Sequence, residues 1–339
     1  MVAETIQFLG IKGAPEINLI LAFIWSLLIG WVFSTVGAFG GVLAGVGHMT
    51  IFGLGSYASS LRDVNESLNR VVTDSVRVSN QWLVGMSAAI SSFNYYRMKR
   101  IVIPLGITLG IGAVIGSISI PMLTAGKLSF RSYQGYFGLF TLIVGFVLLY
   151  EITPRGMARK KKASEAAKAF ENRVRELRKN GNVKELEKEG VNITEVSPRK
   201  IRFTFFGEEF SFNPVLPFFG GIVIASIASL IGVGGGFLYV PFLTSIVGLP
   251  YFIVAGTSAL AVIIGMVVSI YTYMVVKGVP IDFMLIGVEL IGVIIGSLIG
   301  SRTSKYIPER YMKIIFTVLA FYVGLRYTIK GFFGFNLLP

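Results

Sequence analysis

The stretch GVGGGFLYVP, residues 232–241, lies in the middle of a window, 210–276, that contains no Asp, Glu, Lys or Arg. One membrane crossing takes ~20 residues, so this window is long enough for two or three crossings. Its glycines fall at membrane depth and predict a broken helix there, which is tolerated only where the backbone is buried in protein or lines a cavity. Secondary transporters bind substrate at such breaks. The stretch therefore predicts a polytopic membrane protein of the transporter type.

The composition of the chain agrees with a membrane protein. Of its 339 residues, 53% are hydrophobic and 14% are charged, whereas soluble domains carry about 25% charged residues. The absence of cysteine excludes disulfides and thiolate chemistry, and the single histidine, His48, excludes a multi-histidine metal site. The net charge of +13 is attributed to cytoplasmic loops under the positive-inside rule. We expect no cofactor and no nucleic-acid partner.

Charge divides the chain into three parts. Residues 1–152 and 214–339 are predicted to be two membrane repeats, and 153–213 a basic cytoplasmic insert, because Lys and Arg are concentrated there directly after a span. Within the insert we expect a charged helix at 163–180 and a hairpin around Gly207.

The apolar runs predict the spans. The first run, 17–61, is expected to form two helical pieces separated by a glycine break, and the polar stretch 62–80 to be an external loop. Further spans are expected at 81–96, 101–123, 133–152, 214–231, 236–248, 254–276, 280–300 and 311–329.

The two halves resemble each other. Gly112, Gly116 and Ser117 recur 180 positions later as Gly292, Gly296 and Ser297. These small residues are interpreted as close helix contacts rather than ligand sites. Each half then comprises a broken helix pair plus three spans, about 8–10 transmembrane segments in all. Because each half crosses an odd number of times, the sequence predicts an all-α membrane protein of two inverted repeats, with both termini outside.

The glycine breaks are the candidate substrate site. A turn there would expose backbone N–H groups beside the start of the next helix, which favours an anion without any Lys or Arg. Thr257 and Ser258 are expected to add hydroxyl donors at the head of another span. The alternative is that the glycines only allow helices to pack closely. The glycines concerned are Gly232, Gly234, Gly235 and Gly236 in the second half and Gly40 and Gly41 in the first.

Two titratable residues in the apolar segments are candidates for proton coupling. Glu289 is the one charged residue within 283–301, and an ionisable group in a span is costly and usually functional. His48 follows the first glycine cluster. The alternatives are that Glu289 is a structural carboxyl group and that His48 is a hydrogen-bonded structural residue.

The second half resembles the TauE/SafE sulfite exporter family. The resemblance is carried by GVGGGFLYVP (232–241), GLPYFIVAGTSAL (248–260) and RTSKYIPERYMK (302–313). The first half departs from the pattern: Phe39 stands where the family has glycine, and Ser79 and Asn80 occupy the place of Thr257 and Ser258. The resemblance implies transport of a small anion such as sulfite, sulfoacetate or a related sulfur oxyanion.

The leading hypothesis is therefore a secondary transporter of a small anion in the cell membrane, with membrane lipid around it and with a homo-oligomer as a possible assembly. A membrane scaffold or sensor working through the insert is the alternative. A membrane enzyme is disfavoured, because the spans contain no paired carboxylates, histidine cluster or cysteine.

Overall fold

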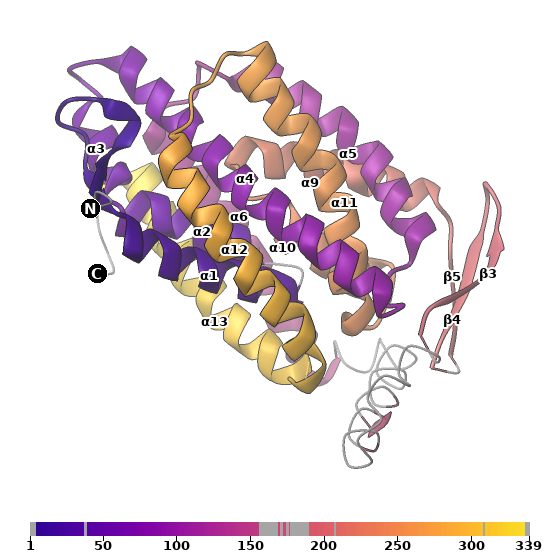
Figure 1. Cartoon of the computed structure of the whole chain (residues 1–339). Helices are drawn as coiled ribbons and strands as arrows, with labels where there is room; N and C mark the ends of the chain where they lie inside the picture. Colours follow the sequence, from indigo (N-terminus) through magenta and orange to yellow (C-terminus); the bar gives the residue numbers. More distant parts are fainter. Residues whose placement is uncertain are drawn as a thin grey trace.

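The computed structural model describes residues 5–36, 39–155, 169, 172–173, 176, 190–206, 208–307 and 309–335. Long helices form one bundle, and a small sheet projects from one end of it (Figure 1). The helices are α1 (Leu19–Val36), α2 (Gly40–Val46), α3 (Leu54–Ser60), α4 (Glu66–Arg97), α5 (Ile103–Thr124), α6 (Phe130–Ile152), α9 (Val215–Ile231), α10 (Gly236–Pro241), α11 (Tyr251–Tyr271), α12 (Phe283–Thr303) and α13 (Glu309–Thr328). The strands are β1 (Thr5–Gln7), β2 (Glu16–Asn18), β3 (Asn192–Val196), β4 (Ile201–Phe205) and β5 (Glu208–Phe212).

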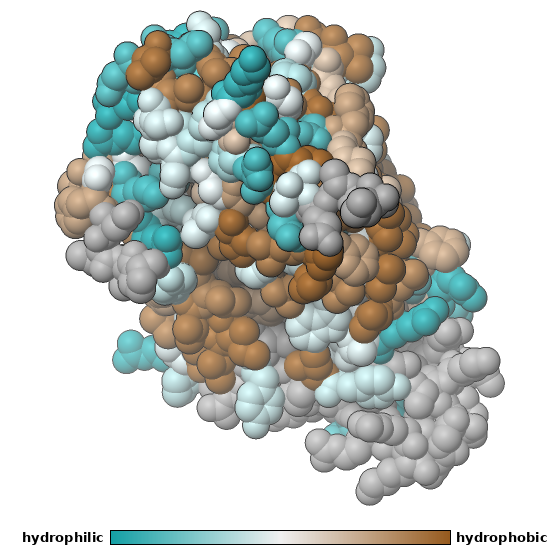
Figure 2. All heavy atoms as spheres, turned by 60° about the vertical axis from the view of Figure 1, so that its left-hand side comes forward, coloured by the Kyte–Doolittle hydropathy of each residue, from teal (hydrophilic) through white to brown (hydrophobic). Residues whose placement is uncertain are grey.

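The apolar helices make this a multi-pass membrane protein. Five segments of the described chain are long and apolar enough to cross a membrane, and three shorter apolar helices accompany them. Their large side chains are exposed at helical spacing, as along α5 at Ile107, Ile111 and Ile115. Figure 2 shows such side chains gathered in an apolar band across one face of the molecule. The predicted all-α polytopic class is confirmed. The five segments are Ile103–Thr124, Phe130–Tyr150, Phe252–Val276, Phe283–Thr303 and Ile314–Phe333.

Each half begins with a helical hairpin. In the first half α1 is followed by a break and by α2, which continues through a π-helical turn to Ile51. In the second half α9 is followed by the glycine break and by α10, which continues in the same way to Ile246. Three long helices follow each hairpin, namely α4, α5 and α6, and then α11, α12 and α13.

Helices of one half pack on helices of the other half in equivalent pairs. Helix α1 packs along α12 while α9 packs along α5, and α4 and α6 pack on α11 and α13. This packing is consistent with a two-fold relation between the halves, and the inverted repeat itself stays a prediction.

The small residues that recur in the two halves are packing positions, as the sequence indicated. A methyl group added at Gly112 would collide with the backbone of α9, and one added at Gly292 or Gly296 would collide with α1. Without a hydrophobic driving force between helices in lipid, such close backbone approach is a main source of association.

The loops lie at two opposite ends of the bundle. At the terminal end, β1 and β2 lie beside the α11–α12 loop, where Leu9 N donates to Asp282 Oδ2 at 2.8 Å, and the α5–α6 loop is also there. At the insert end, Val191 N donates to Lys99 O at 2.7 Å. Figure 1 shows the sheet β3–β5 at this second end, away from the termini. We keep the names terminal end and insert end below.

The expectation that 62–80 is an external loop is wrong. Glu66 begins a 32-residue helix, α4, that runs through this stretch to Arg97 without interruption. From Val72 to Gln81 every residue is buried, and α1, α2, α11 and α12 all contact α4. Polar residues can occupy this central helix because most of them face protein partners rather than lipid. The span expected at 81–96 is only the second half of α4.

The hairpin predicted in the insert is confirmed. Strands β4 and β5 pair antiparallel from Ile201↔Phe212 to Phe205↔Glu208. The strand β3 pairs with the other edge of β4 and was not expected. Most of the helix expected at 163–180 lies outside the described residues.

Candidate functional site

The two glycine breaks meet inside the bundle. A methyl group added at Gly41, at the start of α2, would collide with the carbonyl oxygen of Val233 in the second break. Gly40 packs against α1 in the same way, at Phe33 and Ile29. The tips of the two hairpins therefore touch, and only glycine at position 41 allows the contact.

The second break leaves buried amide groups without partners. Gly232, Gly234 and Gly235 have positive φ angles of 71°, 77° and 70°, which glycine adopts at little cost. The amides of Gly232 and Val233 donate to Ala228 O, which ends α9. Gly234, Gly235 and Gly236 are buried, and their amides form no hydrogen bond with any residue that the structure describes. Buried backbone N–H groups are rarely left unpaired, so this turn offers three donors to a ligand.

A hydrogen-bonded chain joins three of the residues singled out in the sequence. His48 Nδ1 lies 2.6 Å from Asn80 Oδ1, and His48 Nε2 lies 3.2 Å from Glu289 Oε2. Asn80 Nδ2 in turn donates to the Tyr133 hydroxyl at 3.3 Å. Both His48 and Glu289 are fully buried. The chain therefore connects α4, α6, α12 and the π-helical turn after α2.

The geometry assigns the proton positions in this chain. Because Asn80 Oδ1 can only accept, His48 Nδ1 carries a proton. The second ring nitrogen and Glu289 Oε2 then share one proton, either as an ion pair or as a neutral hydrogen bond. Glu289 Oε1 is buried and has no partner among the described residues. One oxygen of this buried carboxyl group is therefore left without a hydrogen bond among the described residues.

Thr257 and Ser258 are not at the head of their helix. They lie nearly two turns into α11, which begins at Tyr251. Thr257 Oγ1 donates to Ile253 O at 2.8 Å and accepts from Val102 N at 3.1 Å, and Ser258 Oγ donates to Ala255 O at 3.2 Å. The expectation of hydroxyl donors at a helix start is corrected on this point, because α11 begins earlier than the apolar run suggested. Ser79 is buried, and its hydroxyl has no partner among the described residues.

A comparison with protein-family models decides the family. The model described as "Sulfite exporter TauE/SafE" matches residues 21–327. The chain belongs to the TauE/SafE family. A search of curated proteins and a search of solved structures found no match. Membership makes this TauE/SafE protein one of a family of membrane transporters of sulfur-containing anions rather than enzymes.

Three polar residues near the breaks were missed: Asp74 and Arg77 lie in the supposed loop, and Gln81 is the first residue of the span expected after it. Asp74, Arg77 and Gln81 are all at most 2% exposed. Arg77 Nη1 donates to Asp74 Oδ1 at 2.7 Å, and the backbone of Arg77 lies against Gly232. Their spacing of three and four residues is helical, and this periodicity would have identified one buried face of α4.

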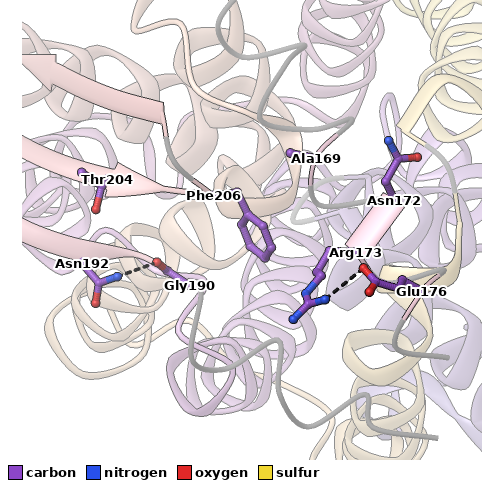
Figure 3. Close-up of a pocket in the computed structure, with 8 residues that line it drawn as sticks. All are labelled: Ala169, Asn172, Arg173, Glu176, Gly190, Asn192, Thr204 and Phe206. Carbon is purple, nitrogen blue, oxygen red and sulfur yellow. Dashed lines mark hydrogen bonds and ion pairs between the residues drawn. The ribbon is translucent and has the colours of Figure 1, made fainter. Parts of the chain in front are cut away.

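A cavity of about 490 Å³ lies in the insert of this TauE/SafE protein (Figure 3). Arg173 and Glu176 on its wall form an ion pair at 2.9 Å, so their charges neutralise each other. The cavity lies apart from the glycine breaks. It is lined by Ala169, Asn172, Arg173, Glu176, Gly190, Asn192, Thr204 and Phe206. We assign it no role in transport.

Proposed function

We propose that this TauE/SafE protein is a secondary transporter of a small sulfur oxyanion, with sulfite as its representative substrate. The proposal is supported chiefly by one observation: the buried, partnerless amides of Gly234, Gly235 and Gly236 lie where two broken hairpins touch. Backbone N–H groups in a turn are suitable donors to an oxyanion. Because backbone amides carry only partial positive charge, they bind an anion less tightly than a Lys or Arg side chain would, and the anion can also be released.

The His48–Glu289 pair is proposed as the proton-coupling element. His48 lies seven residues after Gly41 along continuous helical backbone, which corresponds to about 10 Å. An anion at the break would favour a second proton on the pair through its charge. Loss of that proton after the anion leaves would reset the pair. Transport would then move the anion together with a proton.

Sulfite flux into proteoliposomes containing the purified protein tests the function. We expect saturable uptake of radiolabelled sulfite above protein-free liposomes. Gly235→Val should abolish it, because a branched side chain at a positive φ is strained and would meet Ala228 and Tyr239. Gly287→Val is the matched control, because position 287 is exposed on α12 and has no neighbour within 4 Å. No uptake by the wild-type protein, or normal uptake by Gly235→Val, would contradict the proposal.

A further inference from the structure

One face of α4 carries a stripe of polar side chains, which we call the α4 stripe: Arg70, Asp74, Arg77 and Gln81. Successive members are four, three and four residues apart, so they lie above one another on the same side of the helix. The next position on this face is Val84. The stripe therefore runs from the start of α4 at the terminal end to the middle of the bundle.

The first end of the α4 stripe lies in a pocket at the terminal end. This pocket has a volume of about 310 Å³ and is lined by Arg70 and Asp74 together with Gly126 and the loop 277–280. Lys277, which is exposed, contributes a second cation to its wall. Arg70 also forms an ion pair with Glu66, so an entering anion would have to compete with that carboxylate for Arg70, whereas Lys277 is at the open wall. The size of the pocket suits a small anion.

The other end of the α4 stripe lies at the glycine break. The backbone of Arg77 is against Gly232, and the side chain of Val84 is against Gly234. Gln81 is on the same face between these two positions. The stripe therefore joins the pocket to the proposed anion site.

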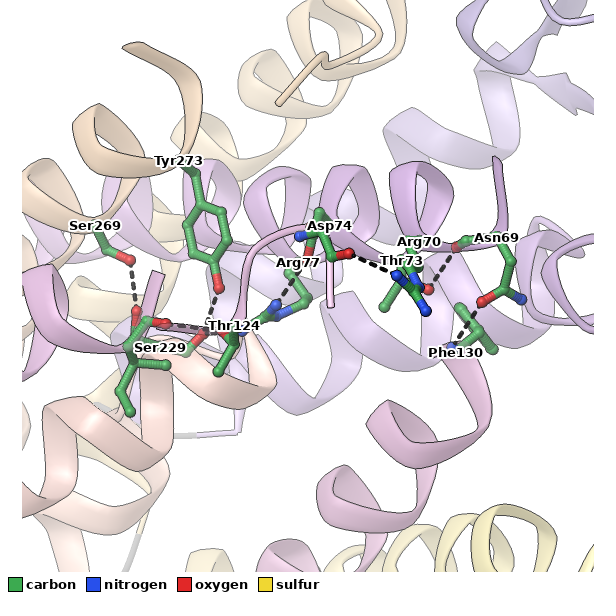
Figure 4. Close-up of polar contacts among 12 residues, drawn as sticks. Asn69, Arg70, Thr73, Asp74, Arg77, Thr124, Phe130, Ser229, Ser269 and Tyr273 are labelled. Carbon is green, nitrogen blue, oxygen red and sulfur yellow. Dashed lines mark hydrogen bonds and ion pairs between the residues drawn. The ribbon is translucent and has the colours of Figure 1, made fainter. Parts of the chain in front are cut away.

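Asp74, on the wall of the pocket, forms an almost fully buried ion pair with Arg77 midway along the stripe (Figure 4). Asp74 accepts from Arg77 Nη1 at 2.7 Å and from Gly126 N at 2.6 Å. Arg77 Nη2 donates to Thr124 Oγ1 at 3.0 Å and to Ser229 O at 3.2 Å. Arg77 Nε has no partner among the described residues. Asp74 thus occupies, as a built-in carboxylate, the position that an incoming anion would take on Arg77.

Gln81 is the least satisfied side chain of the stripe. It is fully buried, and both Nε2 and Oε1 lack a hydrogen-bond partner in the described part of the chain. A buried amide that has no hydrogen-bond partner destabilises the folded protein. Such a cost is expected where a ligand supplies the missing partner.

We propose that the α4 stripe is the terminal-end half of the anion's path. A sulfur oxyanion enters the pocket between Arg70 and Lys277, displaces Asp74 on Arg77, and then accepts a hydrogen bond from Gln81 Nε2 beside the glycine break. The inference rests on the proposed function and names the residues that conduct its substrate.

Replacement of Gln81 by leucine separates a binding role from a structural one. Removal of an unpartnered buried amide should leave the melting temperature in detergent unchanged or raise it. The KM for sulfite should rise about tenfold, from the loss of one hydrogen bond to a charged ligand. Gln81→Leu with the wild-type KM would overturn the inference, and so would a variant that loses flux only in proportion to its folded fraction.

Replacement of Asp74 by asparagine tests the displacement step. Asparagine keeps an acceptor for Arg77, loses the acceptor for Gly126 N and removes the competing charge. The KM for sulfite offered at the terminal end should therefore fall, and kcat should fall with it. Asp63→Asn is the control, because Asp63 is exposed at the same end. An unchanged KM, or a raised KM with a lower melting temperature, would show that Asp74 has only a structural role and would overturn the displacement step.

A second measurement distinguishes failure of this inference from failure of the proposed function. Sulfite should raise the melting temperature of the wild-type protein, and Gln81→Leu should need about tenfold more sulfite for the same shift. A shift without flux in the wild-type protein would refute transport but support the binding residues. Flux with equal shifts in both proteins would refute the α4 stripe and leave the function standing.

Discussion

At the scale of single residues, the site depends on which glycines have neighbours. Gly41 touches Val233, whereas Gly287 has nothing within 4 Å, although both are helical glycines in the sequence. The same holds for carboxylates: Glu289 is fully buried next to His48, while Glu209 lies on the exposed edge of the insert sheet. Residue type alone does not distinguish these cases.

We expect Gly41→Ala to reduce sulfite uptake at least tenfold. The added methyl group cannot coexist with the Val233 carbonyl oxygen, so the two hairpin tips must separate and the turn at Gly234–Gly236 must shift. Gly287→Ala should transport like the wild-type protein. Initial uptake rates in proteoliposomes with matched protein content measure both, and equal rates would show that the hairpin contact is dispensable.

Glu289→Gln should abolish proton-driven accumulation of sulfite but preserve sulfite–sulfite exchange. Glutamine mimics a permanently protonated carboxyl group, so the pair can no longer release a proton, whereas exchange requires only the substrate site. Accumulation under an imposed pH gradient and counterflow in its absence measure the two activities. Glu209→Gln is the control. If Glu289→Gln still concentrates sulfite under a pH gradient, the residue does not carry the coupling proton.

At the scale of elements, the sequence predicted the apolar membrane helices and the glycine breaks between them. It did not predict helix α4, whose polar residues are buried inside the bundle. The spans of α5, α6, α9, α12 and α13 agree with expectation within a few residues, because lipid-facing helices must be apolar throughout. The sequence divided helix α4 between a loop and a span because its first half contains charged residues. In the structure these charges are paired inside the bundle, Arg77 with Asp74 above all. Those partners are brought together by tertiary structure, which hydropathy does not report. The meeting of His48, Asn80 and Glu289 was beyond prediction for the same reason.

The corrected place of Thr257 changes what its removal should do. Thr257→Val removes the acceptor for Val102 N, at the start of α5, and leaves a buried amide unpaired at a cost of about 1–3 kcal/mol. We therefore expect a lower melting temperature and an unchanged KM for sulfite. Thr108→Val is the matched control, because among the described residues the Thr108 hydroxyl bonds only to Pro104 O in its own helix. A raised KM without loss of stability would restore Thr257 to the substrate site.

At the scale of the whole molecule, the two ends define how the chain is oriented. The predicted orientation places the terminal end outside and the insert end in the cytoplasm, because Arg97, Lys99 and Arg100 lie with the basic insert at the latter. A chain without cysteine lets each end be marked by a single added thiol.

An impermeant maleimide applied to intact cells should label Asp63→Cys and leave Arg199→Cys unlabelled. Both positions are exposed, so any difference reports sidedness rather than burial. Disruption of the cells should make Arg199→Cys reactive. The reverse pattern would invert the orientation, and labelling of both in intact cells would refute the division into two ends.

The charges on α4 also bear on how the protein enters the membrane during synthesis. A charged side chain at the centre of a membrane helix opposes insertion by about 2.5–3.5 kcal/mol, and α4 carries Asp74 and Arg77. Helices α11 and α12, which pack around it, are made only after the insert. A ribosome-released fragment 1–213 should leave Asp63→Cys and Arg97→Cys on the same side, whereas the full chain should place them on opposite sides. The second half of the chain would then be required for α4, in the first half, to cross the membrane.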